Sequence, residues 1–298
     1  MTGQGSRNER PRAAWVGAIL ALALVARLAG GFWWQSRLPP EQRLAFGDSQ
    51  SYWQLAQTIY RGEPYQYGSP ESRLFRTPGY PILLAGLFGL WGSDEPPVMA
   101  ARALSAVCGV AAIAVVIALG YRMFDARVGL TAGLVAALYP EAISLGTFVL
   151  SEAPFHPLML LNVFCLREAW VAASRSAGGD TDAKAVRQAD RPDPSVQTVW
   201  GRVWDRKSWR WAVAAGVAAG LATLMRPSWL LFTPYLVILA VAFRAGRPAV
   251  LRLALPMVVA ISVTMLPWWW RNFEVTGRFV PTTLQVGASL YDGWRPDA

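Results

Sequence analysis

The chain has 298 residues and a formal net charge of +9, and 54% of its residues are hydrophobic while only 16% are charged. These values exclude a disordered chain and are atypical of a soluble enzyme. The basic residues lie between apolar runs and form no recognisable nucleic-acid-binding motif, so no nucleic acid is expected as a partner. The composition predicts an all-α polytopic membrane protein, because helices satisfy their backbone groups within a bilayer.

The predicted transmembrane helices number about seven. The first stretch follows three arginines within residues 7–12, as a cleaved signal peptide does. Its apolar run continues past Arg27 to aromatic residues at 32–34, which favours a retained span that ends in an aromatic belt. The seven stretches of approximate spanning length are residues 13–34, 98–120, 128–147, 153–172, 210–225, 228–243 and 249–267.

The distribution of positive charge determines how a shorter apolar segment, residues 77–92, is interpreted. Two prolines open this segment, which fits either a span or a half-helix that dips into the membrane. If it does not cross, most of the 28 basic residues lie on one side, which the positive-inside rule places in the cytoplasm. The sequence therefore predicts a half-helix at 77–92, a cytoplasmic N-terminus, and an external position for both Asp48 and Glu152.

These assignments give the expected domain organisation. The chain is predicted to form a single transmembrane domain over residues 1–298. Residues 35–97 are expected to be an external loop with an amphipathic helix beginning near Asp48, because apolar side chains recur there at helical spacing. Residues 173–209, with Gly, Asp, Pro and mixed charge, predict a flexible cytoplasmic insert. Residues 268–298 are predicted to be an external C-terminal segment.

Two acidic residues are candidates for chemistry at the external face. Asp48 is either a helix N-cap or a carboxylate that accepts a proton from an attacking hydroxyl or binds a divalent cation beside a phosphate. Glu152 opens a span, where it either stabilises the helix start or assists the chemistry. If Mg²⁺ or Mn²⁺ is bound, these two residues are its expected ligands. His156, the only histidine, is expected to be a packed polar residue, and Glu141 is a further acid in the third span.

Four arginines are predicted to reach the same external face, namely Arg73, Arg76, Arg226 and Arg271. Guanidinium groups bind phosphate through paired hydrogen bonds and remain charged, so they are suited to stabilising a departing lipid phosphate. The alternative is that each side chain simply extends to the membrane interface. Arg27 and Arg102 lie within spans, where a lipid-facing charge is costly, so this alternative does not account for them.

Several short motifs, in this order, resemble the GT-C superfamily of polytopic glycosyltransferases. They are an external Asp soon after the first span, a Tyr a few residues later, RTPGYP before an apolar segment, SE about a dozen residues after a Pro, an RP pair and a late PWWWRN. The resemblance covers roughly residues 14–294. Within the superfamily the chain is most similar to the protein O-mannosyltransferases and the bacterial lipid A aminoarabinose transferase.

This resemblance implies a seven-span module that transfers a sugar from a polyprenyl-phosphate donor to an acceptor at the external face, in a bacterial inner membrane. By position, Asp48 matches the catalytic acid of the first external loop, and Glu152 matches the acid of the second. The chain departs from the family pattern in ending soon after the seventh span and in its long cytoplasmic insert. Together with the arginines selected above by charge, the residues predicted to bind substrate are Arg73, Arg76, Tyr80, Arg226, Arg271 and Asn272.

A second hypothesis is a polytopic membrane protein without catalytic activity, either a lipid-phosphate transporter or a scaffold for envelope assembly. A transporter is expected to carry ionisable residues near the midplane and paired repeats, whereas the acids here gather at one face. The two hypotheses differ in whether Asp48 and Glu152 meet. A shared site favours the enzyme, and wide separation favours the scaffold.

Overall fold

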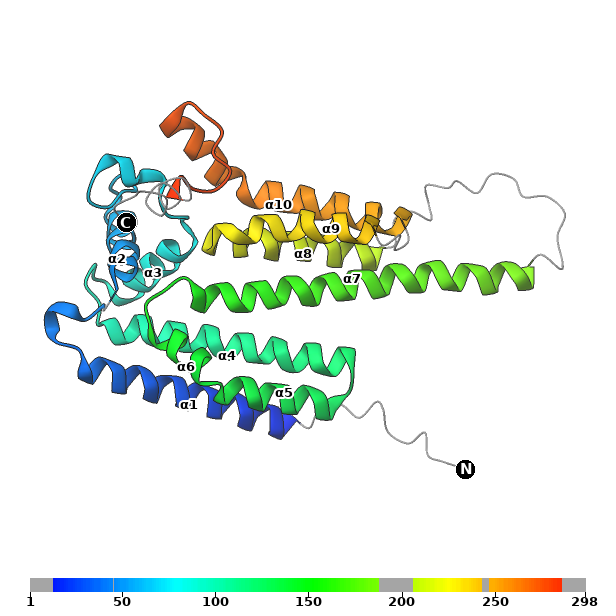
Figure 1. Cartoon of the computed structure of the whole chain (residues 1–298), viewed down its shortest axis with the longest axis horizontal. Coiled ribbons are helices and arrows are strands. Elements are labelled where there is room, and N and C mark those ends of the chain that lie inside the picture. Colours follow the sequence, from blue (N-terminus) through cyan, green and yellow to red (C-terminus); the bar gives the residue numbers. More distant parts are fainter. Residues whose placement is uncertain (1–12, 45, 188–205, 243–246, 286–298) are drawn as a thin grey trace, which may run out of the picture. The chain divides into compact units, whose positions relative to one another are not determined.

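A computed structural model describes residues 13–44, 46–187, 206–242 and 247–285, and the regular structure in these ranges is entirely helical (Figure 1). This confirms the predicted fold class. In chain order the elements are α1 (Ala13–Arg37), η1 (Pro40–Gln42), α2 (Gly47–Arg61), η2 (Pro70–Leu74), α3 (Gly79–Trp91), α4 (Val98–Met123), α5 (Ala126–Leu138), α6 (Pro140–Thr147), α7 (Glu152–Arg187), α8 (Arg206–Met225), η3 (Pro227–Leu231), α9 (Phe232–Ala242) and α10 (Arg247–Thr276).

Every apolar stretch predicted to span the membrane overlaps with one or more of these helices. Three segments in the described ranges are each long and apolar enough to cross a bilayer alone: Ala13–Arg37, Val98–Met123 and Leu253–Thr276. Helices α5 and α6 qualify together as one span bent by 55°. The chain is therefore an integral multi-pass membrane protein, and the count of seven spans stays a prediction.

The bend between α5 and α6 has a local cause. Pro140 opens α6, and the residue before a proline is driven out of the helical region, as Tyr139 is with φ −66° and ψ 116°. The bend leaves carbonyl groups at the end of α5 without helical partners. Arg27 supplies donors to two of them, with Nη1 lying 3.2 Å from the Ala137 oxygen and Nη2 lying 3.4 Å from the Ala136 oxygen.

By its internal packing the chain divides into two units. The first comprises residues 1–160, 222–227 and 268–298. Within it α1, α4, α5 and α6 pack against one another, α2 packs on α3, and α3 contacts α4. Part of its core lies between α1, α4 and α5 and consists of Ile19, Ala23, Ile113, Ile117 and Ala137.

The second unit comprises residues 161–221 and 228–267. Cys165 of α7, Ala215 of α8 and Met257 of α10 form a buried cluster in it. A polar contact fixes the α7–α8 pair, because the buried Asn162 Nδ2 donates to the Ala215 oxygen at 2.8 Å. All of the candidate site residues lie in the first unit.

Two helices are longer than the sequence pattern predicted. Helix α7 continues to Arg187, so residues 173–187 of the predicted flexible insert are helical, although they include Gly178 and Gly179, which disfavour a helix interior. Residues 188–205 of that insert lie outside the described residues. Helix α10 continues through Pro267 to Thr276, because the returning chain packs on its last turns and Trp268 Nε1 donates to the Thr282 oxygen at 2.8 Å.

Candidate functional site

The first acid lies at the start of α2. Phe46 is the N-cap residue of this helix and makes no capping hydrogen bond through its side chain, so Asp48 lies within the first turn instead of capping it. A carboxylate in the first turn is stabilised by the helix dipole. Asp48 Oδ1 accepts a hydrogen bond from Arg76 Nη2 at 2.5 Å, while 56% of the Asp48 side chain remains exposed. The carboxylate is therefore both held in place and accessible.

The second acid forms a matching pair. Glu152 opens α7, and its Oε1 accepts from Arg226 Nη1 at 2.6 Å. Arg226 follows the end of α8 directly and precedes Pro227, which starts η3. The Arg226 guanidinium also lies over the Phe155 ring, 5.9 Å from its centroid. Two acid–arginine pairs thus come from four segments that are far apart in the sequence.

Two buried side chains join these pairs. Tyr52, one helical turn after Asp48, donates its hydroxyl to Ser151 Oγ at 3.1 Å, and Ser151 Oγ lies 3.5 Å from Glu152 Oε2. The Arg76 guanidinium lies over the Tyr52 ring, 5.3 Å from the centroid. We call Asp48, Arg76, Tyr52, Ser151, Glu152 and Arg226 the acid–arginine network. It places the two predicted catalytic acids in one connected site.

The electrostatics of the network agree with this connection. Burial raises the pKa of Tyr52, its hydrogen bond with Ser151 and the charge of Arg76 lower it, and the charges of Asp48 and Glu152 both add to the increase. Burial lowers the pKa of Arg76, but Tyr52 and Asp48 more than offset this, and the net pKa is raised. Arg76 is therefore cationic at any physiological pH. The charges of Asp48 and Glu152 both raise the pKa of the same group, the Tyr52 hydroxyl.

The raised pKa of Tyr52 predicts a pH dependence of stability. The folded state holds the phenol proton more tightly than the unfolded chain, so Tyr52 contributes stability below the unfolded pKa of about 10, and this is lost as pH rises through the folded pKa. Tyr52→Phe is therefore expected to flatten the loss of thermal stability above pH 10. Tyr60→Phe on the same helix is the control, and an equal flattening there would contradict the prediction.

A close backbone approach brings the two arginines together. Gly79 begins α3 after the RTP sequence, and a Cβ on Gly79 would lie 2.6 Å from the Leu224 oxygen and 2.8 Å from its carbonyl carbon. Next to this approach, Thr77 Oγ1 donates to the Met225 oxygen at 3.3 Å. The segment carrying Arg76 is thereby fixed on the segment carrying Arg226.

The other two predicted arginines have different surroundings. Arg271 Nη1 donates to the Arg73 oxygen at 2.8 Å, and Nη2 donates to the Tyr65 oxygen at 3.2 Å. Its guanidinium also lies over the rings of Tyr65 and Trp268, at 5.1 and 4.9 Å. Arg73 Nε donates to Gln66 Oε1 at 2.8 Å. Because these guanidinium groups donate to oxygen atoms of the protein, Arg271 and Arg73 hold the loop that leads to Arg76.

Tyr80 and Asn272, predicted to bind substrate, are both fully buried. The Tyr80 ring packs edge-on against Tyr52 at 5.3 Å, so Tyr80 supports the network from behind. Asn272 Nδ2 donates to the Val280 oxygen at 3.0 Å and thereby holds the chain that returns after α10. Both side chains therefore contact other parts of the protein, and their predicted contact with substrate stays a prediction.

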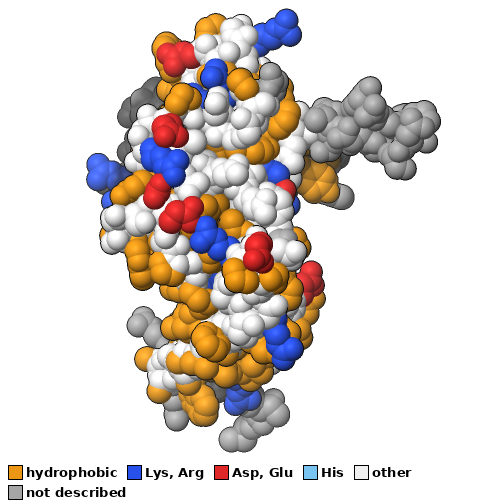
Figure 2. Space-filling model, turned by 90° about the vertical axis from the view of Figure 1, so that its left-hand side faces the viewer, with side chains coloured by type: hydrophobic (Ala, Val, Ile, Leu, Met, Phe, Trp, Pro, Cys, Tyr) orange, Lys and Arg blue, Asp and Glu red, His pale blue; other side chains and the backbone are white. Residues whose placement is uncertain are grey.

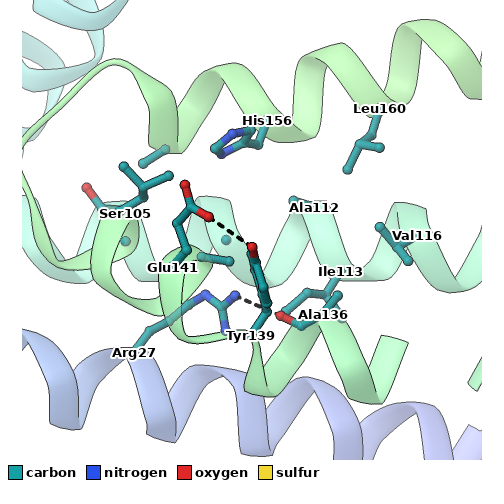
Figure 3. Close-up of a pocket in the computed structure, with 15 residues that line it drawn as sticks. Arg27, Ser105, Ala112, Ile113, Val116, Ala136, Tyr139, Glu141, His156 and Leu160 are labelled. Carbon is teal, nitrogen blue, oxygen red and sulfur yellow. Dashed lines mark hydrogen bonds between the residues drawn. The ribbon is translucent and has the colours of Figure 1, made fainter. Parts of the chain in front are cut away.

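The two cations predicted within spans are buried and donate mainly to backbone oxygens. Arg102 donates to Gln35 Oε1 at 3.0 Å, to the Arg43 oxygen at 2.9 Å and to the Thr147 oxygen. Arg27 lies beside a cavity of about 340 Å³, which Figure 3 shows between α1, α4, α6 and α7. Glu141 and His156 also line this cavity, which contains no member of the acid–arginine network.

The residues present do not fit a divalent cation held by protein ligands. Each predicted ligand, Asp48 and Glu152, already pairs with an arginine. Within the ranges that the structure describes, no group of three or more His, Cys, Asp or Glu side chains is arranged to hold a metal ion. Asp48 and Glu152 are therefore not assigned as metal ligands.

Sequence reasoning missed Tyr52 and Ser151 as members of the site. A signal existed for Tyr52, because it lies four residues after Asp48 and so on the same face of α2. Ser151 adjoins Glu152, but its contact with α2 depends on tertiary structure. Figure 2, which faces the end that carries α2, shows acidic and basic side chains interspersed on that surface.

Comparisons with known proteins agree with this architecture. ArnT from Cupriavidus metallidurans, solved with undecaprenyl phosphate, aligns with a TM-score of 0.61 and 19% identity over 90% of this chain and 43% of that chain. The Archaeoglobus fulgidus oligosaccharyltransferase, tethered to an acceptor peptide, aligns at 0.60 and 19% over 87% of this chain and 30% of its own. The chain has the GT-C fold.

Two further comparisons bear on the family. The S. cerevisiae Pmt1–Pmt2 protein O-mannosyltransferase complex, bound to its sugar donor, aligns with a TM-score of 0.57 and 14% identity over 88% of this chain and 34% of that one. Residues 76–177 match the dolichyl-phosphate-mannose-protein mannosyltransferase family. No match was found among curated protein sequences. The chain spans less than half the length of each of these three solved structures.

Proposed function

We propose that this chain forms the donor-binding and catalytic part of a membrane glycosyltransferase. It transfers a sugar from a polyprenyl-phosphate donor to an acceptor at the external membrane face. The observation that carries the proposal is the acid–arginine network, in which two carboxylates from distant segments share one site with two guanidinium groups. A carboxylate suited to accept a proton and cations suited to a phosphate are the two requirements of such a transfer.

Asp48 is assigned the role of general base. An acceptor hydroxyl attacks the anomeric carbon of the donor and forms the new C–O bond, and its proton passes to the Asp48 carboxylate. The bond between the anomeric carbon and the phosphate oxygen breaks, and the polyprenyl phosphate leaves with the electron pair. This single displacement inverts the anomeric configuration. The exposed half of Asp48 is the part available to the acceptor.

Arg76 and Arg226 are assigned to the donor phosphate. Charge grows on the leaving phosphate as the glycosidic bond breaks, and fixed cations stabilise that charge most where solvent is partly excluded. The Arg76 side chain is only 12% exposed, and the Arg226 side chain is 41% exposed. Each arginine is held by one carboxylate in this structure, so the phosphate joins or replaces the carboxylate on binding. Glu152 positions Arg226.

Binding of undecaprenyl phosphate to the purified full chain tests these assignments. A charge-assisted hydrogen bond contributes about 1.5–3 kcal/mol, so Arg76→Gln and Arg226→Gln are each expected to weaken binding at least tenfold. Arg61→Gln is the matched control, because Arg61 forms a comparable external pair with Asp94 outside the network. Equal affinities for all four proteins, or equal weakening in the control, would remove the phosphate site from the proposal.

The rival hypothesis of a scaffold or transporter predicts no turnover. The connection of Asp48 to Glu152 through Arg76, Tyr52 and Ser151 favours the enzyme, since a scaffold has no need to bring these acids together. The purified full chain distinguishes the two hypotheses. A transferase releases free polyprenyl phosphate from a sugar-linked donor, whereas a transporter moves the intact donor across the membrane.

A further inference from the structure

Two hollows meet at the bend between α5 and α6, apart from the acid–arginine network. One is the cavity of about 340 Å³ beside Arg27. The other, of about 640 Å³, lies along the outer side of α5. They share Ala136, Tyr139 and Ala142, so the outer hollow adjoins the inner one at the bend. We call the outer hollow the α5 groove.

The α5 groove is apolar along most of its length and has a cation at one end. Val128, Ala132, Val135 and Ala136 recur at helical spacing and form a stripe along α5. Arg127 lies at the beginning of the helix and lines the same groove. Among the residues that the structure describes, no acid pairs with Arg127.

The neighbouring polar groups are already engaged. Asp125, two residues before Arg127, caps α5 by accepting a hydrogen bond from the Val128 amide at 2.8 Å. The Tyr139 hydroxyl, at the other end of the groove, donates to Glu141 Oε2 at 2.9 Å, as Figure 3 shows. Tyr139 therefore offers its ring to the groove. The groove therefore offers a ligand the Arg127 guanidinium and the Thr131 hydroxyl near one end and an otherwise apolar surface beyond them.

The length of the groove matches one leaflet of a bilayer. Helix α5 has 13 residues and rises about 20 Å from its start beside Arg127 to the bend. The hydrocarbon of a single leaflet is about 15 Å deep. A hydrocarbon chain that begins at Arg127 thus ends near the bend, where the inner cavity adjoins the groove.

We propose that the α5 groove binds one anionic phospholipid, with its phosphate at Arg127 and one acyl chain along Val128, Ala132 and Val135. Hydrocarbon is the natural occupant of an apolar groove within the bilayer, since water there is costly. The unpaired guanidinium selects an anionic headgroup over a zwitterionic one. The inner cavity receives the end of the chain. This lipid is bound in addition to the proposed donor, at a place that shares no residue with the acid–arginine network.

Native mass spectrometry of the purified full chain with dioleoyl phosphatidylglycerol and dioleoyl phosphatidylcholine tests the proposal. One phosphatidylglycerol molecule is expected to bind about fivefold more tightly than phosphatidylcholine, because one basic residue near an anionic headgroup contributes about 1 kcal/mol. Arg127→Gln is expected to abolish this preference, and Arg37→Gln, outside both hollows, to keep it. Val135→Trp is expected to weaken both lipids about tenfold by filling the groove.

Leu134→Trp is the matched control for bulk. Leu134 is the neighbouring exposed residue of α5, and it does not line the groove. Equal lipid binding by the Val135→Trp and Leu134→Trp proteins would overturn the groove assignment, provided that both unfold at the wild-type temperature. Absence of a headgroup preference in the wild type would overturn the role of Arg127. Displacement of phosphatidylglycerol by equimolar undecaprenyl phosphate would reassign the groove to the donor lipid.

Discussion

Asp48→Asn is expected to lower the rate of sugar transfer by about 10²- to 10⁴-fold, the range that a positioned general base contributes. The amide has nearly the same shape as the carboxylate but cannot take the acceptor proton. The measurement is release of undecaprenyl phosphate from a panel of undecaprenyl-phosphate-linked sugars by the purified chain. Because Arg76 and Arg226 remain, binding of undecaprenyl phosphate is expected to persist, and the loss falls on turnover.

Asp94→Asn is the matched control for Asp48→Asn. Asp94 is another acid that pairs with an arginine, accepting from Arg61 Nε at 2.7 Å, and it lies outside the network. This variant is expected to retain wild-type turnover. If the Asp48→Asn protein turned over donor at the wild-type rate, Asp48 would have no part in the chemistry and the proposed mechanism would be wrong.

Gly79→Ala is expected to destabilise the protein by about 3 kcal/mol, the upper end of the range for overpacking. It is also expected to abolish turnover. The added methyl group would meet the backbone of Leu224, and backbone atoms cannot move aside as the end of a flexible side chain can. Relief of the clash requires α3 to move away from residues 224–226, which separates Arg76 from Arg226. Thermal unfolding in detergent and donor turnover measure the two effects.

Gly86→Ala provides the control within the same helix. A Cβ at Gly86 meets no atom within 4 Å, and alanine in place of glycine stabilises a helix interior by about 0.5–1 kcal/mol. This variant is expected to unfold at a slightly higher temperature and to keep its activity. Equal behaviour of the Gly79 and Gly86 variants would show that the approach to Leu224 does not support the site.

The helical fold was predictable because the bilayer restricts the choices. Apolar length identified the regions that become α1, α4, α5 with α6, and the later helices, and two prolines marked the short helix α3. The ends of helices were less predictable. Residues 173–187 have a loop-like composition and residues 268–276 follow a proline, yet both segments are helical. For residues 268–276 a tertiary contact, the hydrogen bond from Trp268 Nε1 to the Thr282 oxygen, accounts for this.

The site was predictable in part for a different reason. Asp48, Glu152, Arg76 and Arg226 are charged residues near span ends, so a sequence reading selects them. Which arginine faces which acid depends on the close approach at Gly79, and no local pattern encodes that distance. Arg271 illustrates the limit, because its sequence context matches that of a phosphate-binding residue while its donors go to the Arg73 and Tyr65 carbonyls.

The position of Arg27 has a consequence for biogenesis. An arginine at the centre of a helix opposes its insertion by about 2.5–3.5 kcal/mol. The carbonyls of Ala136 and Ala137 that receive its guanidinium are synthesised more than a hundred residues later. Helix α1 therefore enters the lipid before α5 is made, when only the Ala23 oxygen of its own helix accepts from the Arg27 guanidinium, and it reaches its final state when α5 arrives. Assembly of α1 is thereby coupled to that of α5. The bend after α5 leaves the carbonyl groups that complete the hydrogen bonding of Arg27.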